Sequence, residues 1–171
     1  MYLDECHLHT HPHQAKVWQR RGARQSVPAA GVDQRVTVFG ALDYRTGQLV
    51  TEIAERASSA TFQAFIASLV PLWPHDHLVL VMDNASYHKA AALRHWAMTQ
   101  TPEVTLLWLP TYSPHLNLIE RVWRFVKQRL ACHRFWNDLP SLIAFATQLM
   151  DRTQATFAAP TNPHIQSVHN F

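Results

Sequence analysis

The sequence predicts an α/β fold with a mixed β-sheet of about five strands, the first three antiparallel, flanked by helices. Two observations predict it. Three strand-like segments come first, and a turn at residues 45–47 joins the second to the third. Two short, continuously apolar segments then alternate with segments of helical spacing, an order typical of β-α-β units whose parallel strands are buried.

The length and composition favour one ordinary domain. The chain has 171 residues, of which 47% are apolar and only 16% are charged, whereas roughly a quarter is usual for charged residues. This composition argues against a disordered chain or a coiled coil, and a complete (β/α)8 barrel needs roughly 200 residues or more. The net charge of +3 and the isoelectric point near 9.1 permit a polyanionic partner without requiring one.

The cysteines and the apolar runs predict a cytoplasmic protein. Cys6 and Cys132 form neither a metal-binding spacing nor a disulfide framework, and we expect both to be inert thiols. No apolar run approaches the roughly 20 residues of a membrane span, and no signal segment follows Met1. The first strand begins almost at Met1, so we expect that a preceding segment is missing from this chain.

The first third of the chain is predicted to hold three strands and one long connection. Residues 1–8 form the first strand, residues 35–44 the second, and residues 48–54 the return strand of a hairpin. Residues 9–34 contain Pro and Gly without clear periodicity, which predicts a loop or an irregular hairpin. Four basic residues surround Trp18 in this connection: Lys16, Arg20, Arg21 and Arg24.

The rest of the chain is predicted to alternate helices and strands. Predicted helices cover residues 59–72, 86–99, 117–134 and 139–157, and predicted strands cover residues 77–83 and 104–109. Ser58 or Ser59 is available to cap the first helix, and we expect Ser86 to cap the second. Asn84 is either another cap or a residue of a functional site.

Three acids stand out by their positions. Asp4 lies in the first strand, and Asp83 ends an apolar strand, where open α/β sheets place their ligand sites. Glu120 lies in the first turn of the helix after the next strand. The interval between Asp83 and Glu120 holds a helix, a strand and a loop, which is enough chain to return Glu120 beside Asp83. Asp43 and Asp151 compete for the same role, but both fit structural interpretations.

The helix around Glu120 has two distinct faces. With Glu120 at 0°, five apolar residues fall between about 200° and 300°: Ile119, Val122, Trp123, Val126 and Leu130. Three bases fall within about 40° of Glu120: Arg124, Lys127 and Arg134. Taken alone, these bases also fit a solvated face with an i, i+4 pair between Glu120 and Arg124.

Three carboxylates near bases suit metal-dependent chemistry on a polyanion. Oxygen ligands suit Mg²⁺ or Mn²⁺, and two such ions about 4 Å apart can activate a nucleophile and stabilise a leaving oxygen in phosphodiester cleavage. Nearby basic residues fit the same interpretation, because phosphate contacts carry much of the affinity for nucleic acids.

Three segments together resemble the DDE transposases of the mariner superfamily, most closely its bacterial insertion-sequence branch. They are Asp4-Glu5, residues 81–88 (VMDNASYH) and residues 109–123 (LPTYSPHLNLIERVW). The motifs D-N-A-x-x-H and S-P-x-L-N-x-x-E-x-x-W are specific in this order and separation. The likeness runs from residue 4 to about residue 150, and it includes residues 18–22, 27–28, 40–42 and 46–47. Leu118 departs from the pattern, which usually has proline there.

The resemblance implies one catalytic domain over residues 1–171 with a ribonuclease-H-like fold. It implies two divalent ions, Mg²⁺ or Mn²⁺, with Asp4 bridging them and Asp83 and Glu120 completing the coordination. The implied activity is cleavage at transposon ends and strand transfer into target DNA, often at a TA dinucleotide. The implied partners are DNA, a second copy in a homodimer on DNA, and an upstream-encoded helix-turn-helix protein, because that DNA-reading region is absent here. A nucleoid location on DNA in bacteria follows.

The resemblance also assigns residues around the acids. Asn84, His88 and Asn117 match motif positions near the site, and His88 either contacts DNA or packs in the core. The bases expected to contact DNA are Arg20, Arg21, Arg24, Arg124 and Lys127.

Two alternative functions stay open. The first is a truncated, non-catalytic remnant that binds DNA or a full-length transposase. The second is a zinc hydrolase, because alternating histidines on a strand would share one face and bind Zn²⁺ or Ni²⁺, although Pro12 interrupts such a strand. These histidines are His7, His9, His11 and His13.

Overall fold

The sheet of the computed structural model has five strands in the order β3-β2-β1-β4-β5. The structure describes residues 1–11, 20–22, 31–89, 91–111, 113–130 and 136–157. The strands are β1 Tyr2–His9, β2 Arg35–Leu42, β3 Leu49–Ala54, β4 Leu78–Met82 and β5 Val104–Trp108. β1, β2 and β3 pair antiparallel, whereas β1, β4 and β5 pair parallel. The predicted mixed sheet is therefore confirmed.

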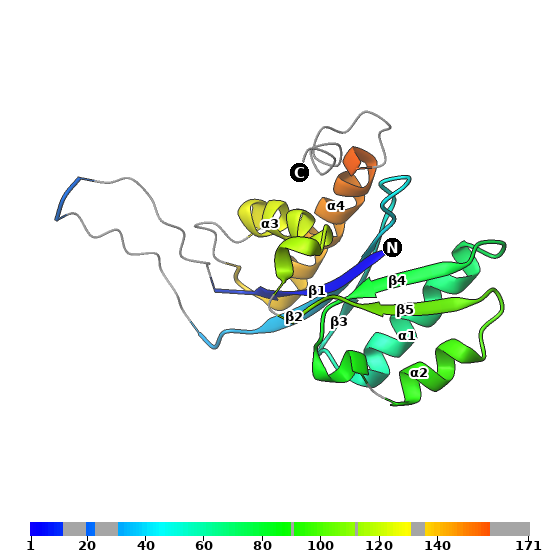
Figure 1. Cartoon of the computed structure of the whole chain (residues 1–171). Coiled ribbons are helices and arrows are strands. Elements are labelled where there is room, and N and C mark those ends of the chain that lie inside the picture. The colour runs from blue at the N-terminus through cyan, green and yellow to red at the C-terminus, as the bar shows by residue number, and fades with distance from the viewer. Residues whose placement is uncertain (12–19, 23–30, 90, 112, 131–135, 158–171) are drawn as a thin grey trace.

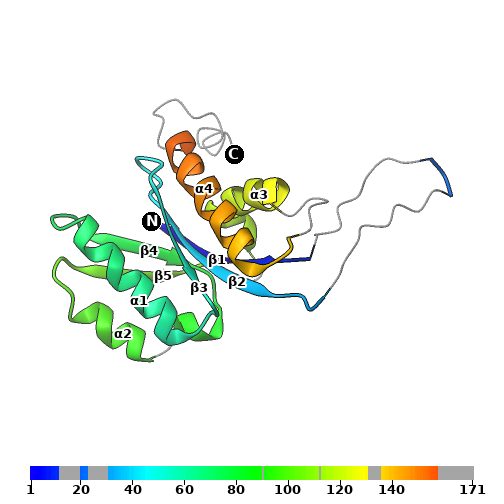
Figure 2. The same cartoon turned by 180° about the vertical axis from the view of Figure 1, so that it is seen from behind.

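Helices cover both faces of this sheet (Figure 1 and, from behind, Figure 2). The α-helices are α1 Ser59–Leu69, α2 Ala91–Met98, α3 Ile119–Leu130 and α4 Leu139–Phe157, and the 3₁₀ helices are η1 Val70–Leu72, η2 Ser86–Lys89 and η3 Pro114–Leu116. α1 and α2 lie on one face of the sheet, and α3 and α4 lie on the other. Within the described residues, no helix has the length and apolar character to cross a membrane.

Strand alternation divides the core into two halves. On β1, Cys6 and Leu8 pack among the residues of α3 and α4, whereas Leu3 packs among those of α1 and α2. Because successive side chains on a strand point to opposite faces, Asp4 shares the α3 face with Cys6, and Glu5 shares the α1 face with Leu3.

α3 buries the apolar stripe that its sequence predicts. Its five buried residues are Ile119, Val122, Trp123, Val126 and Leu130. The Trp123 ring lies directly on Gly40 of β2, where a Cβ atom would come within 2.6 Å of Trp123 Cη2. Gly40 therefore lets α3 approach the sheet more closely than any larger residue would allow.

Three predicted helix starts differ in outcome. Ser58 caps α1, since its hydroxyl accepts from the Thr61 N–H and completes a capping box. Ser86 instead opens the 3₁₀ helix η2, and α2 begins only at Ala91. α3 begins at Ile119 rather than at Asn117, whose side chain is engaged by β1.

The turn between β2 and β3 accounts for Asp43. Its carboxylate accepts from the Arg45 N–H at 2.9 Å and from the Thr46 hydroxyl at 2.7 Å, while Gly47 takes a positive φ of 74°. The structural interpretation of this acid is confirmed. Asp151 is exposed on α4.

Candidate active site

Asp4 and Asp83 lie at the same level of two adjacent parallel strands. Asp4 is on β1, opposite Gly40 of β2, and it is half-buried on the α3 face. Asp83 directly follows β4. The register of β1 with β4 pairs Tyr2 with Val81, so each acid stands two residues beyond this pair in the same direction. Parallel register therefore places the two carboxylates together.

Glu120 reaches the same place from α3. The Asn117 side chain is buried and its Nδ2 donates to the Leu3 carbonyl oxygen at 2.9 Å. The Asn117 carbonyl in turn accepts from the Glu120 N–H at 3.2 Å. These two bonds tie the first turn of α3 to the residue that precedes Asp4.

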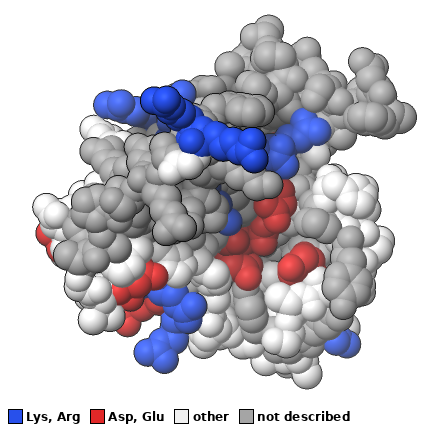
Figure 3. Space-filling model, turned by 90° about the vertical axis from the view of Figure 1, so that its left-hand side faces the viewer, with Lys and Arg blue, Asp and Glu red and all other residues white. Residues whose placement is uncertain are grey.

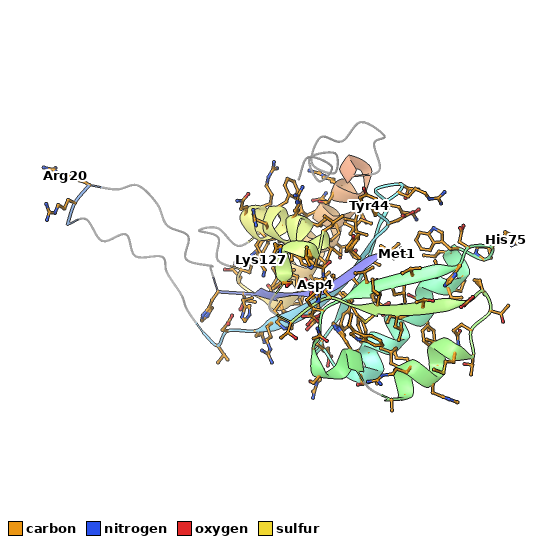
Figure 4. The ribbon with its side chains drawn as sticks, viewed as in Figure 1. Met1, Asp4, Arg20, Tyr44, His75 and Lys127 are labelled. Carbon is orange, nitrogen blue, oxygen red and sulfur yellow. The ribbon has the colours of Figure 1, made fainter. Side chains whose placement is uncertain are left out.

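All three predicted acids line one cavity of about 370 Å³. Asn84, Asn117 and parts of the loop after β5 complete its wall. Figure 4 shows Asp4 on β1 between α3 and the β4–β5 half of the sheet, and Figure 3 shows acidic side chains gathered in a hollow of this face. The structure thus brings together the residues that the sequence singled out, although their catalytic roles stay a prediction.

The cavity concentrates negative charge. Burial, followed by the negative charge of Glu5, raises the pKa of Asp4 to about 8, and the charges of Glu120 and Asp83 act in the same direction. A divalent cation would offset this repulsion, and the donors are the oxygen atoms that Mg²⁺ and Mn²⁺ prefer. In the described part of the chain, no three His, Cys, Asp or Glu side chains lie close enough to hold one ion together. Each ion would therefore need water or phosphate oxygens as additional ligands.

The chain matches a known family over most of its length. Residues 1–143 match the family model described as DDE superfamily endonuclease. The chain belongs to this family.

Two curated proteins are similar to this DDE endonuclease chain. One is the uncharacterized 39 kDa protein of insertion element IS630 from Shigella sonnei, with 27% identity over 149 residues, which cover 84% of this chain and 43% of that protein. The other is the uncharacterized protein y4pE/y4sA of Sinorhizobium fredii, with 27% identity over 108 residues, which cover 62% of this chain and 76% of that protein. The chain thus spans less than half of the IS630 protein.

Solved structures of Mos1 transposase share the fold. The paired-end complex with the left transposon end superposes with a TM-score of 0.69 at 17% identity, covering 98% of this chain and 50% of the Mos1 chain. The separate catalytic domain of Mos1 mariner transposase gives a TM-score of 0.59 at 16% identity, covering 80% and 68%. The likeness confirms the ribonuclease-H-like fold class.

Two motif residues of the DDE endonuclease chain make polar contacts beside the cavity. His88 is fully buried, and its Nδ1 lies 2.7 Å from Asp83 Oδ1, which agrees with packing in the core. Asn84 Nδ2 donates to the Leu109 carbonyl, which joins the chain after β4 to the chain after β5. Asn84 also lines the cavity.

Sequence reasoning missed Glu5 as a partner in the site. Its Oε2 lies 3.6 Å from His88 Nε2, and its side chain is only 15% exposed. The signal was present, because an acid that shares a strand face with Leu3 is a charge on an otherwise buried surface.

The predicted DNA-contacting bases fall into two groups. Arg124 and Lys127 are exposed on α3, as are Arg121 and Arg129, which were not predicted. Figure 3 shows Lys and Arg side chains along one side of the acidic hollow. Arg20 and Arg21 are exposed, and Figure 4 places Arg20 far from Asp4. Two bases lie outside the described residues: Arg24 and Arg134.

The described histidines of the N-terminal run contact polar side chains of neighbouring segments, and the His11 N–H donates to Asp33 Oδ1 at 3.1 Å. His7 Nδ1 lies 3.1 Å from the Thr37 hydroxyl, and His9 Nδ1 lies 2.7 Å from Asp33 Oδ2. β1 ends at His9, and His13 lies outside the described residues. These contacts give structural roles to His7 and His9.

Cys6 is a buried thiol. Burial is the largest of the effects that raise its pKa to about 12, although the positive charge of Lys127 acts in the opposite direction. The side chain is 1% exposed, so the prediction of an unreactive thiol agrees with its surroundings. Cys132 lies outside the described residues.

Proposed function

We propose that this chain is the catalytic domain of an insertion-sequence transposase that cleaves DNA strands and transfers them into target DNA. The carrying observation is that Asp4, Asp83 and Glu120, from three separate elements, line one cavity. Mos1 transposase, which shares the fold, has been solved in a strand transfer complex and in paired-end complexes with Mn and with Mg. The remnant alternative is not favoured, because none of the three acids is lost.

The residues that would hold Mg²⁺ or Mn²⁺ are the three carboxylates of Asp4, Asp83 and Glu120. Such ions, when bound, activate the attacking oxygen and stabilise the leaving oxygen of a phosphodiester. The chain's own residues supply the placement: β1 carries Asp4, the end of β4 carries Asp83, and α3 carries Glu120. The charge of a bound cation would offset the repulsion from Glu5, Glu120 and Asp83 that acts on Asp4.

DNA is the proposed substrate, both as transposon end and as target. The proposed phosphate contacts are Arg124 and Lys127, since both are exposed on the helix that carries Glu120. Their contribution is independent of base sequence, because phosphate contacts carry no sequence information. The homodimer on DNA and the separate helix-turn-helix protein stay predictions.

The test is nicking of supercoiled DNA that carries a candidate transposon end, with Mg²⁺ or Mn²⁺ supplied. We expect metal-dependent nicking that Asp83→Asn reduces by at least about 100-fold, which corresponds to about 2.7 kcal/mol of barrier. The matched control is Asp151→Asn, because Asp151 is exposed on α4 and does not line the cavity. Equal nicking by Asp83→Asn and the unsubstituted chain would exclude the proposed site.

A further inference from the structure

Three side chains form a continuous bridge beneath the cavity: Glu5, His88 and Asp83. His88 Nδ1 lies 2.7 Å from Asp83 Oδ1, and His88 Nε2 lies 3.6 Å from Glu5 Oε2. The imidazole between the two carboxyl groups is fully buried, while the Asp83 side chain is 53% exposed toward the cavity side. The bridge therefore joins a buried acid to an acid that lines the cavity.

This bridge lies beyond the register pair that joins β1 to β4. Among the described residues, parallel pairing of β1 with β4 is limited to Tyr2 and Val81. Beyond that pair, Glu5 belongs to β1, and Asp83 follows β4. The two strands are thus linked by side chains beside Asp4, which lies within β1, and Asp83, which directly follows β4.

The position of His88 is fixed independently of Asp83. Its ring packs on Phe62 of α1, with centroids 4.1 Å apart. Its carbonyl oxygen accepts from Trp108 Nε1 at 3.3 Å, and its N–H donates to the Ala85 carbonyl at 3.0 Å. A side chain held in this way is a rigid support for whatever bonds to its ring.

The support acts on one particular oxygen of Asp83. Oδ1 accepts from the Ala85 N–H at 2.9 Å and also contacts His88 Nδ1. Two bonds to one oxygen restrict rotation of the carboxylate about its Cβ–Cγ bond. Packing on Phe62 does not by itself require a histidine at position 88, because a phenylalanine ring would also pack there. Only the imidazole nitrogens contact Glu5 and Asp83.

On the basis of the proposed function, we propose that Glu5 and His88 are positioning residues that orient Asp83 for a divalent cation. The Glu5 carboxylate, 3.6 Å from His88 Nε2, orients the imidazole by charge and not by a hydrogen bond, and His88 Nδ1 contacts Asp83 Oδ1 at 2.7 Å. β1 then serves the site twice, with Asp4 on its α3 face and Glu5 on its α1 face. Hydrogen-bonding partners of metal ligands typically change metal affinity or activity by about 10- to 100-fold when they are replaced.

The experiment compares two acid–histidine pairs in the full chain. Glu5→Gln and His88→Asn are the test variants. Glu103→Gln and His77→Asn are matched controls, because His77 and Glu103 form a surface pair 3.9 Å apart with side chains 49% and 75% exposed. Two quantities are measured for each: binding of Mn²⁺ alone by electron paramagnetic resonance, and nicking as a function of Mn²⁺ concentration.

We expect Glu5→Gln and His88→Asn to raise the Mn²⁺ concentration for half-saturation about 10-fold in both measurements. At saturating Mn²⁺ the maximal nicking rate should recover most of its value, and both controls should match the unsubstituted chain. A merely structural role for Glu5 would change the melting temperature without this shift in metal dependence.

An unchanged Mn²⁺ concentration for half-saturation in folded Glu5→Gln overturns the inference. If His88→Asn does not fold, the result for Glu5→Gln alone is used. If the chain binds Mn²⁺ but nicks no DNA, the proposed function alone is wrong. The effect of Glu5→Gln on Mn²⁺ binding then still tests whether Glu5 positions Asp83. A chain that binds no Mn²⁺ at millimolar concentration overturns both.

Discussion

The two walls of the cavity hold their acids in different ways. On one wall, Glu120 is carried by α3, which is docked through five buried apolar side chains and through Trp123 on Gly40. On the other wall, Asp83 follows a short strand and is held by polar contacts to His88 and the Ala85 N–H. Glu120 is therefore placed by the burial of a whole helix face, and Asp83 by a few directed bonds.

Because the two acids are held by different kinds of contact, substitutions around them should affect folding stability and metal binding to different degrees. Apolar contacts act over a large area and support the fold and the site together. Directed bonds to one carboxylate contribute less to stability but set its orientation. We therefore expect changes on the α3 wall to reduce folding and activity together, and changes on the Asp83 wall to act mainly on metal dependence. Four predictions test this distinction.

The largest effect is expected at Trp123. Its side chain is 1% exposed, and Trp123→Ala should lower the free energy of unfolding by about 3–5 kcal/mol, since a fully buried aromatic is removed. Chemical denaturation measures this change. Trp96→Ala is the control, because Trp96 is only partly buried and should cost less. Equal losses at both positions would contradict the importance of the α3 docking.

A smaller effect on folding, with a specific effect on activity, is expected at Gly40. The added methyl of Gly40→Ala would clash with Trp123 and with Ile119 Cδ1, which lies 2.8 Å from it, so α3 has to shift. We expect a loss of about 1–3 kcal/mol in the free energy of unfolding. Nicking should fall and should not recover at high Mn²⁺, in contrast to Glu5→Gln. Recovery at high Mn²⁺ would remove the distinction between the walls.

Asn117 tests the tie between α3 and β1. Asn117→Ala leaves the buried Leu3 carbonyl without its 2.9 Å donor, which should cost about 1–3 kcal/mol in the free energy of unfolding. The first turn of α3 also loses its anchor, so the maximal nicking rate should fall more than Mn²⁺ affinity. Thermal melting and Mn²⁺ titration measure the two effects, and a pure shift in Mn²⁺ affinity would contradict this role.

The last prediction concerns the pH dependence of stability without metal. The pKa of Asp4 is about 8 in the folded chain and 3.8 as an isolated group. Between these values the folded state keeps a proton that the unfolded state has lost, so this residue lowers stability progressively as pH rises from about 4 to 8. In EDTA, Asp4→Asn should therefore melt above the unsubstituted chain at pH 8, with the difference shrinking toward pH 5. A difference that does not depend on pH would be inconsistent with this shift.

Much of the fold follows from local periodicity. The apolar stripe of α3 and the bounds of α4, Leu139–Phe157, agree with the prediction, because a helical repeat depends only on near neighbours along the chain. The second predicted helix, at residues 86–99, is divided into η2 and α2. In η2, the His88 side chain contacts Asp83 and Phe62. The spacing of apolar residues along the chain does not predict these contacts.

The site was predictable in its acids but not in their supports. Asp4 was predicted within the first strand, Asp83 at the end of an apolar strand and Glu120 in the first turn of a helix, and the motifs contained all three. Glu5 was passed over, since its role depends on His88, which lies far along the chain. Asn117 was placed near the site, but its bond to Leu3 joins residues 114 positions apart.

The sequence by itself determined the elements, the faces of α3 and the identity of the three acids, because these depend on residue type and short-range spacing. Only the tertiary structure decided that the acids meet in one cavity, that His88 is buried, and that β1 contributes Glu5 beneath Asp83. The physical reason is that the register of β1 with β4 and the docking of Trp123 on Gly40 join distant segments. The relative positions of these segments are set when the helices pack on both faces of the sheet.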